Sequence, residues 1–267
     1  LVKQGGKINA VGTPDKPIVM TSEKEEPGAW GGIHICGRAH TNAEGGKGSS
    51  EIGGAVYGGN DDADNSGTLQ YIRLEYTGFA FDEEHEANGI SFYGVGNGTI
   101  VDHCQAYKGS DDGFEFFGGS VNVSNLVAVS CSDDSFDWTE GWNGKGTNLV
   151  AYQEAESTLG YDCDCLMECD NNGSNNAATP VAHPVLKNLI LVGNGGSKQG
   201  IRLRAGTEVE IDNAKVCGKG QPLTVETALT ENALKNGTSK LTNITLTSEL
   251  SCKEGIRSEE HTSELQS

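Results

Sequence analysis

A 22-residue repeat is the feature that most constrains how this chain can fold. The segment "SDDGFEF" at 110–116 returns as "SDDSFDW" at 132–138, so that Asp133 matches Asp111 22 residues later. A unit of this length cannot bury an apolar face alone, and it becomes stable when neighbouring copies stack. We therefore expect a chain built from stacked coils.

Two short patterns alternate along the chain from residue 71 to residue 225. An apolar-x-apolar motif after a small residue recurs at 32–35, 89–92, 113–116, 135–138, 160–163, 200–203 and 222–225. A second apolar pattern recurs at 71–74, 103–106, 125–128, 148–151, 188–191 and 213–216. Alternation of apolar and other residues is typical of strands with one buried face. Helical periodicity is confined to 224–237, which could hold a short helix.

Two short strands per repeat, separated by turns, predict an all-β fold. The fold expected is a parallel β-helix with coils about 4.8 Å apart. Stacking predicts a ladder of amides along the first strands, formed by His103, Asn125, Asn148, Asn188 and Asn213. It also predicts internal aromatic stacks along the second strands, formed by Phe92, Phe116 and Trp138 and by Phe114, Phe136 and Tyr161.

Composition excludes some classes of function. The formal net charge is −19, which argues against binding nucleic acid and fits a secreted or cation-binding protein. The sequence holds no run of about 18 apolar residues, so no membrane-spanning segment is expected. The eight cysteines predict disulfides in a secreted chain. The alternatives are buried free thiols, as for Cys104 and Cys163, or a zinc site in "CDCLMEC".

Both ends of the sequence look unlike the ends of a domain. The opening "LVKQGGKINAVGT" reads as sequence from the middle of a domain, and "RSEEHTSELQS" at 257–267 looks like a translated sequencing adapter. We expect one β-helix domain over 1–256, truncated at both its N-terminus and its C-terminus, with 257–267 outside the fold.

The Gly-rich coils, the Asn ladder and the aromatic stacks resemble the pectate-lyase-type β-helix. This resemblance implies an all-β fold class, the right-handed parallel β-helix or pectin-lyase-like solenoid. More narrowly, "GKINAVGTPDKPIVMTS…PGAWGGIHICG" and "SDDGFEFFGG…SDDSFDW" resemble a family of secreted proteins and outer-membrane lipoproteins of Bacteroidetes and spirochaetes. The resemblance covers nearly the whole chain. It implies a secreted or cell-surface location in a Gram-negative bacterium and a groove facing polysaccharide. No catalytic motif can be matched to it residue by residue.

Acidic residues are expected to stack on the outer face of the second strands. Glu115, Asp137 and Asp162 form one predicted column, followed by Arg202, and Asp164 and Arg204 belong to the column beside it. Two carboxylates one coil apart repel by roughly 3 kcal/mol at an effective dielectric constant near 20. Calcium, raised pKa values or the two arginines could each offset this. The prediction is therefore either a ligand or metal groove or a solvated acidic face with ion pairs.

Three further groups are candidates for chemistry. Asp111, Asp112, Asp133 and Asp134 precede the acidic column and could bind calcium or cap their own turns. The half calcium loop of "NDDADNSGT" offers Asp62, Asp64 and Ser66, but its twelfth position is Arg73, so a solvated loop is the alternative. The insertion 78–89 carries His85 beside Glu83, Glu84 and Glu86, which form either an acid/base cluster or an exposed loop. A second insertion is predicted at 163–184.

Two functions are compatible with these features. The favoured hypothesis is a non-catalytic module that binds cell-surface glycan or polysaccharide, or acts as an adhesin or structural element. The alternative is a calcium-assisted polysaccharide lyase or glycoside hydrolase, with catalytic residues drawn from Glu115, Asp137, Asp162 and Arg202. The fold alone cannot separate them.

Overall fold

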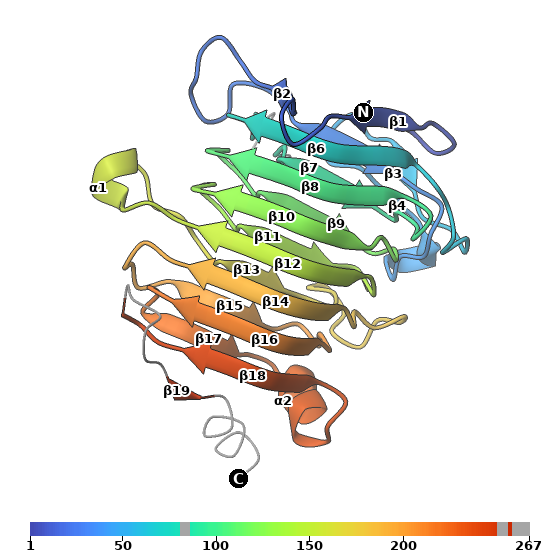
Figure 1. The fold of residues 1–267 in the computed structure, drawn as a ribbon. Helices are drawn as coiled ribbons and strands as arrows, with labels where there is room; N and C mark the ends of the chain where they lie inside the picture. The colour runs from blue at the N-terminus through green and yellow to red at the C-terminus, as the bar shows by residue number, and fades with distance from the viewer. Residues whose placement is uncertain (81–85, 250–255, 258–267) are drawn as a thin grey trace.

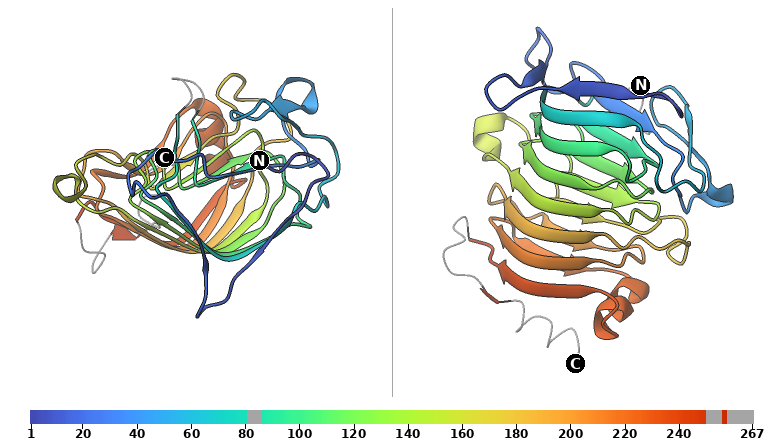
Figure 2. Two further views of the ribbon diagram at one scale, coloured as in Figure 1. Left: turned by 90° about the horizontal axis from the view of Figure 1, so that it is seen from above. Right: turned by 45° about the vertical axis from the view of Figure 1, so that its right-hand side comes forward.

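The computed structural model describes residues 1–80 and 86–249 and the backbone of 256–257. Nearly all of its strands belong to two parallel sheets that face each other across the core (Figures 1 and 2). Sheet 1 contains β1 (Ile8–Val11), β2 (Ile18–Met20), β6 (Gly67–Glu75), β8 (Ile100–Tyr107), β10 (Val123–Val129), β12 (Lys145–Tyr152), β14 (Val185–Val192), β16 (Glu210–Cys217), β18 (Lys240–Leu246) and β19 (Ile256–Arg257). Sheet 2 contains β3 (Ile33–Cys36), β7 (Ile90–Tyr93), β9 (Phe114–Phe117), β11 (Phe136–Thr139), β13 (Met167–Cys169), β15 (Gln199–Leu203) and β17 (Gln221–Val225).

The remaining elements lie outside these sheets. They are the 3-10 helix η1 (Glu44–Gly46), the antiparallel pair β4 (Gly48–Ser49) and β5 (Val56–Tyr57), and the helices α1 (Glu156–Leu159) and α2 (Ala228–Lys235). Figure 1 shows the coils stacked from β1 and β6 to β18, with α1 projecting from one side of the stack. The parallel β-helix predicted from the repeat is confirmed, and so is the short helix within 224–237. Most of the predicted tail 257–267 lies outside the described residues.

One predicted strand of sheet 2 is wrong. The segment 160–163 follows α1 in a loop, and the strand between β11 and β15 is β13. "GYDC" has the small-apolar-x-apolar pattern, but "MEC" places Met167 and Cys169 inward on the next coil. The predicted insertion 163–184 is therefore two excursions, one before β13 and one after it. Tyr161 does not join the aromatic stack, and its hydroxyl donates to the Ser130 carbonyl at 2.7 Å.

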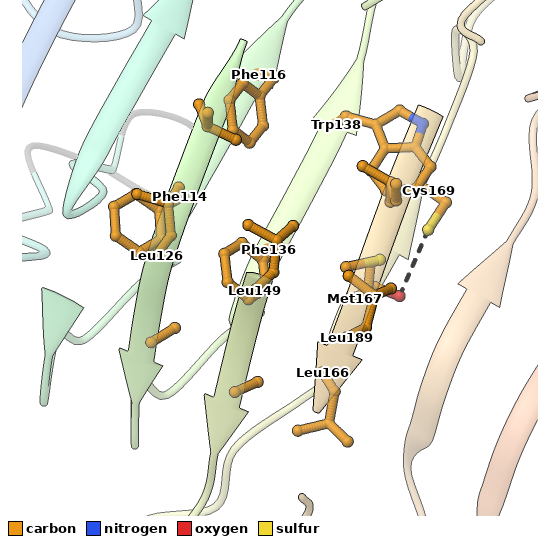
Figure 3. Packing of buried hydrophobic residues seen from close by; sticks show 14 of the residues in the cluster. Phe114, Phe116, Leu126, Phe136, Trp138, Leu149, Leu166, Met167, Cys169 and Leu189 are labelled. Atoms are coloured by element: carbon orange, nitrogen blue, oxygen red, sulfur yellow. Dashed lines mark hydrogen bonds between the residues drawn. The ribbon is translucent and has the colours of Figure 1, made fainter. Parts of the chain in front are cut away.

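Aromatic side chains fill the core between the sheets as predicted. Phe114, Phe116, Phe136 and Trp138 are each at most 2% exposed, and Figure 3 shows them packed with leucines of sheet 1. The rings of Phe92 and Phe116 stack with centroids 5.0 Å apart. One detail differs from the prediction: Trp142 stacks on Phe116 at 4.1 Å and lies beside Trp138, because the turn after β11 folds back into the core.

The predicted ladder is confirmed for its asparagines but is wrong for His103: Asn125 Nδ2 donates to Asp102 Oδ1 at 2.8 Å, and the His103 ring contacts Asp102 at 2.9 Å. Each amide Nδ2 donates to the Oδ1 of the preceding coil, at 2.9 Å from Asn148 to Asn125, 3.0 Å from Asn188 to Asn148 and 2.8 Å from Asn213 to Asn188. These residues have φ between 54° and 62°. Asn tolerates this left-handed conformation better than most residues. The ladder therefore stabilises the bend within β10, β12, β14 and β16.

Candidate functional site: an acidic hollow on sheet 2

The outer face of sheet 2 carries an open hollow of about 190 Å³, which we call the acidic hollow. Its lining residues come from β9, β11, the turns that precede them and two loops. They are Glu51, Glu86, Asn88, Asp111, Asp112, Glu115, Asp133 and Asp137. Seven of the eight carry carboxyl groups, and none of these described lining residues is Lys or Arg. The hollow therefore concentrates negative charge at one place.

The repeated "SDD" segments explain how the chain builds this hollow. The second aspartate of each segment is buried and binds the backbone of the next coil: Asp112 accepts from the N–H of Asp134 at 2.9 Å, and Asp134 accepts from the N–H of Cys165 at 2.6 Å. These bonds hold the turns in register. The first aspartates, Asp111 and Asp133, line the hollow one coil apart. The 22-residue step thus places equivalent carboxyl groups side by side.

The carboxylate oxygens converge in two overlapping sets. Asp111, Asp112 and Asp133 form one set, and Asp112, Glu115 and Asp137 form the other, with one oxygen from each residue within 4.8 Å of the rest of its set. Oxygen ligands of calcium lie at about 2.3–2.6 Å from the ion, so two ligands of one ion can be up to about 5 Å apart. The spacing and the all-oxygen chemistry of both sets fit a calcium-like cation.

Two buried oxygens at the hollow lack hydrogen-bond donors. Asn88 is 1% exposed, and its Nδ2 donates to Ser91 Oγ and to a Glu115 oxygen. This orients the amide and leaves Asn88 Oδ1 without a partner. Asp137 Oδ1 is likewise buried and unpartnered. A buried acceptor without a donor is costly. Both atoms are of the type that coordinates a hard cation, which is a second, independent indication of a ligand here.

Burial and crowding raise the pKa values of the hollow's acids. Burial is the largest cause, followed by the charges of neighbouring carboxylates, and together they raise the pKa of Asp111 to about 8. The same causes place the pKa values of Asp112, Glu115 and Asp137 well above their usual range. A cation would favour the ionised carboxylates and oppose this effect.

Beyond Asp137 the acidic column is neutralised by arginine. Because β13 replaces the predicted strand 160–163, the residue next to Asp137 is Glu168, and Arg202 follows it. Arg202 binds Glu168 at 3.1 Å and Glu226 through two bonds of 3.0 and 3.2 Å. Arg204 binds Asp170 at 2.8 Å and also contacts Glu168. The ion pairs of the second alternative are present in this half of the column, but Glu168 and Asp170 are largely buried rather than solvated.

Asp162 and Asp164 are therefore not members of the acidic columns, contrary to the sequence-based expectation. Asp162 is exposed and accepts from the Asn194 amide at 2.8 Å. Asp164 pairs with Lys198 at 2.9 Å. Both lie in the loop between α1 and β13, where the chain leaves the stack.

The half calcium loop has a structural role, because its acidic side chains accept hydrogen bonds from a neighbouring loop. Asp62 accepts from the ring and the backbone N–H of His40 at 2.7 and 3.1 Å, and Asp64 accepts from the backbone N–H of Arg38 at 2.8 Å. The backbone N–H of Ser66 donates to the Thr99 hydroxyl at 2.8 Å. These three residues form no ligand cluster with other described side chains. Of the predicted cluster around His85, only Glu86 lies within the described residues, and it lines the acidic hollow.

The ion pairs of Arg204 give a first prediction. Replacing Arg204 with Met leaves Glu168 and Asp170 partly buried without that partner, so the free energy of unfolding should fall by about 1–3 kcal/mol. Urea unfolding monitored by circular dichroism measures this. Lys215→Met, at an exposed position on β16, is the matched control and should change little. A loss in the arginine variant no greater than in the control would contradict the role assigned to Arg204.

Both states expected for the cysteines, disulfide-bonded and free and buried, occur among the described residues. Cys217 forms a disulfide, and Cys36, Cys104, Cys131, Cys163, Cys165 and Cys169 are free and buried. The free-thiol interpretation of Cys104 and Cys163 is confirmed. No described helix has the length and apolar character needed to cross a membrane.

A family model for the pectate-lyase like beta helix domain matches residues 1–267. The chain belongs to this family. No curated protein and no solved structure gives a significant match. Membership of the pectate-lyase like beta helix domain family agrees with the stacked coils described above, and it leaves the chemistry of the acidic hollow to be argued from the residues of this chain.

Two residues of the hollow, Glu51 and Asn88, were not predicted from the sequence. Glu51 reaches the hollow from the hairpin of β4 and β5, and Asn88 reaches it from the end of the loop before β7. The two loop residues belong to no repeat, so only the folded chain brings them to the hollow.

Proposed function

We propose that this protein is a non-catalytic glycan-binding module that binds acidic polysaccharide through a divalent cation, most simply calcium, in the acidic hollow. The observation that most directly supports this proposal is the convergence of two sets of three carboxylates, at cation-ligand spacing, in an open hollow. Uncompensated, this charge would repel a polyuronate chain. A bound cation would supply a positive site with coordination positions available to sugar carboxylate and hydroxyl oxygens.

The arginines favour binding over catalysis. A lyase needs a base beside the bound sugar. Arg202, the one basic residue among the predicted catalytic candidates, is held by Glu168 and Glu226. Lys198, the lysine whose charge acts on Asp133, is paired with Asp164. The one feature that favours hydrolysis is Asp111, since a carboxyl with a pKa of about 8 keeps its proton at neutral pH and could act as a general acid. This is the second candidate function.

The features of this chain also bear on where the protein is located. We infer a secreted or outer-membrane, cell-surface protein, in keeping with the resemblance to secreted proteins and lipoproteins of Bacteroidetes and spirochaetes. The Cys217 disulfide supports this, because disulfides persist in oxidising compartments. The net charge of −19 is also compatible with an extracellular setting.

Binding to immobilised polygalacturonate, with and without calcium, tests the proposed function. We expect retention in calcium, loss in chelator, and at least a tenfold weaker affinity for Asp137→Asn, equivalent to about 1.4 kcal/mol. Asp15→Asn, an exposed acid in the loop between β1 and β2, is the control and should bind normally. Equal retention with calcium and chelator would contradict the proposal. Shortening of the polymer during incubation would favour the lyase or hydrolase.

A further inference from the structure

A buried lysine lies against an asparagine side chain of the preceding coil, away from the acidic hollow. Lys219 follows β16 and is 0% exposed. Its Nζ lies 3.1 Å from Asn194 Oδ1 and 3.0 Å from the carbonyl oxygen of Cys163. Gly193 makes the approach possible, because a Cβ there would meet Cδ and Cγ of Lys219 at 2.6 Å. The packing around Lys219 thus places its amine against the amide group of Asn194.

Both polar atoms of the Asn194 amide group, Oδ1 and Nδ2, are hydrogen-bonded. Its Oδ1 accepts from the backbone N–H of Gly196 at 3.0 Å as well as from Lys219. A backbone donor at this oxygen would stabilise the negative charge that develops when a nucleophile adds to the carbonyl carbon. Its Nδ2 donates to Asp162 Oδ1 at 2.8 Å. The leaving nitrogen is therefore in contact with a carboxylate that can transfer protons.

The surroundings also favour a nucleophilic amine. Burial lowers the pKa of Lys219, while the charge of Asp162 acts in the opposite direction. A desolvated lysine that loses its proton is a competent nucleophile toward carbonyl carbon. Complete burial of the amine also keeps bulk water from competing for the carbonyl carbon.

We propose that Lys219 and Asn194 join through an isopeptide bond, with Asp162 as the residue that relays the proton. The neutral Nζ adds to Cγ of Asn194 and forms the new N–C bond. The bond from Cγ to Nδ2 then breaks. A proton from Nζ passes through the Asp162 carboxylate to Nδ2, which leaves as ammonia. The reaction is a transamidation, and it requires no oxidant, reductant or external reactant.

The distances permit this reaction after a small movement. Since a carbonyl bond is about 1.23 Å long, Nζ lies at most about 4.3 Å from Cγ, and reacting atoms approach to about 3–3.5 Å. The product would link the turn after β14 to the turn after β16, where Gly193 and Gly195 already bond to Cys217 and Gly218. It would add a covalent connection between adjacent coils and so restrict their separation on unfolding.

Intact mass spectrometry of the purified full chain tests the inference. The wild-type protein should be lighter than its sequence mass, corrected for the disulfide, by about 17 Da, the mass of one ammonia. A proteolytic digest should contain one branched peptide that joins the segments around Lys219 and Asn194. Lys219→Met and Asn194→Ala should each show their full sequence mass. Asp162→Asn, at an exposed position, should retain the fold and reduce the cross-linked fraction at least tenfold.

Two outcomes would overturn the inference. A folded wild-type protein with its full mass shows that the bond does not form, and this result does not depend on any variant folding. Asn194 precedes Gly195, so loss of ammonia could also arise from a succinimide within the chain. A mass loss that persists in Lys219→Met, without a branched peptide in the wild type, identifies that succinimide. Lys215→Met controls for the loss of a lysine and should keep the cross-link.

Discussion

Removing calcium at pH 8 is expected to lower the melting temperature of this protein by about 10 °C. A ligand present at 1,000 times its Kd stabilises the folded state by about 4 kcal/mol, and each kcal/mol shifts the melting temperature of a chain of this size by about 2–4 °C. The physical reason is relief of repulsion among the acids of the hollow, above all Asp112, which belongs to both oxygen sets.

The same acids determine how the stability of the folded protein depends on pH when a chelator has removed calcium. A carboxyl group whose pKa is higher in the folded than in the unfolded state contributes to the stability of the folded protein. This contribution is fully present below the unfolded pKa and is lost as the pH rises through the folded pKa. For Asp111 this window runs from 3.8 to about 8. Without calcium, stability should therefore fall as the pH rises across this window, and calcium should flatten the fall at its upper end.

Differential scanning calorimetry at several pH values, with calcium and with chelator, measures both effects. Asp137→Asn should reduce the calcium-dependent shift, and Asp15→Asn should leave it unchanged. Equal melting temperatures in calcium and chelator at pH 8 would contradict the proposed cation site. They would favour the alternative of a solvated acidic surface. A calcium shift that survives Asp137→Asn would place the ion in the set of Asp111, Asp112 and Asp133, which does not include Asp137.

Truncation of Phe116 should destabilise the stack of coils by about 3–5 kcal/mol. This side chain is 2% exposed and lies between the rings of Phe92 and Trp142, at 5.0 and 4.1 Å. Its removal in Phe116→Ala opens a cavity in a core that spans both sheets (Figure 3). The rigid neighbouring coils limit how far the structure can relax into it.

Chemical denaturation of Phe116→Ala and wild type measures this cost. Tyr152→Ala removes an aromatic ring of similar size from an exposed position on β12 and should cost less than about 1 kcal/mol. Equal losses for the two variants would show that the stacked aromatic core does not carry the stability assigned to it.

Most of the fold could be predicted because every coil needs the same kinds of residue at equivalent positions. Alternation in "GFEF" and "SFDW" separates inward from outward side chains, since successive residues of a strand face opposite sides. The same alternation identified Glu115 and Asp137, which do lie in register on β9 and β11. The Asn ladder was predictable for a similar reason, because each coil needs a residue that tolerates the bend in sheet 1.

The prediction failed where the repeat is interrupted. "GYDC" matches the strand pattern better than "LMEC" does, so Asp162 was assigned a place that Glu168 holds. Local pattern cannot decide which of two candidate segments pairs with β11, because that choice depends on the burial of Met167 and Cys169 and on the bonds of Glu168 to two arginines. Asp162 instead lies beside Asn194 and Lys219, in the proposed cross-link.

By itself, the sequence determined the stacked coils, the inward aromatics and the pairing of equivalent acids 22 residues apart, since these follow from strand periodicity and a constant coil length. Only the tertiary structure decided which acids converge and which are neutralised. Glu51 and Asn88 reach the acidic hollow through loops without a repeat, and Arg202 and Arg204 reach Glu168 only after the chain has looped out and returned. Contacts between residues distant in sequence depend on how loops pack, and no periodicity in the chain encodes them.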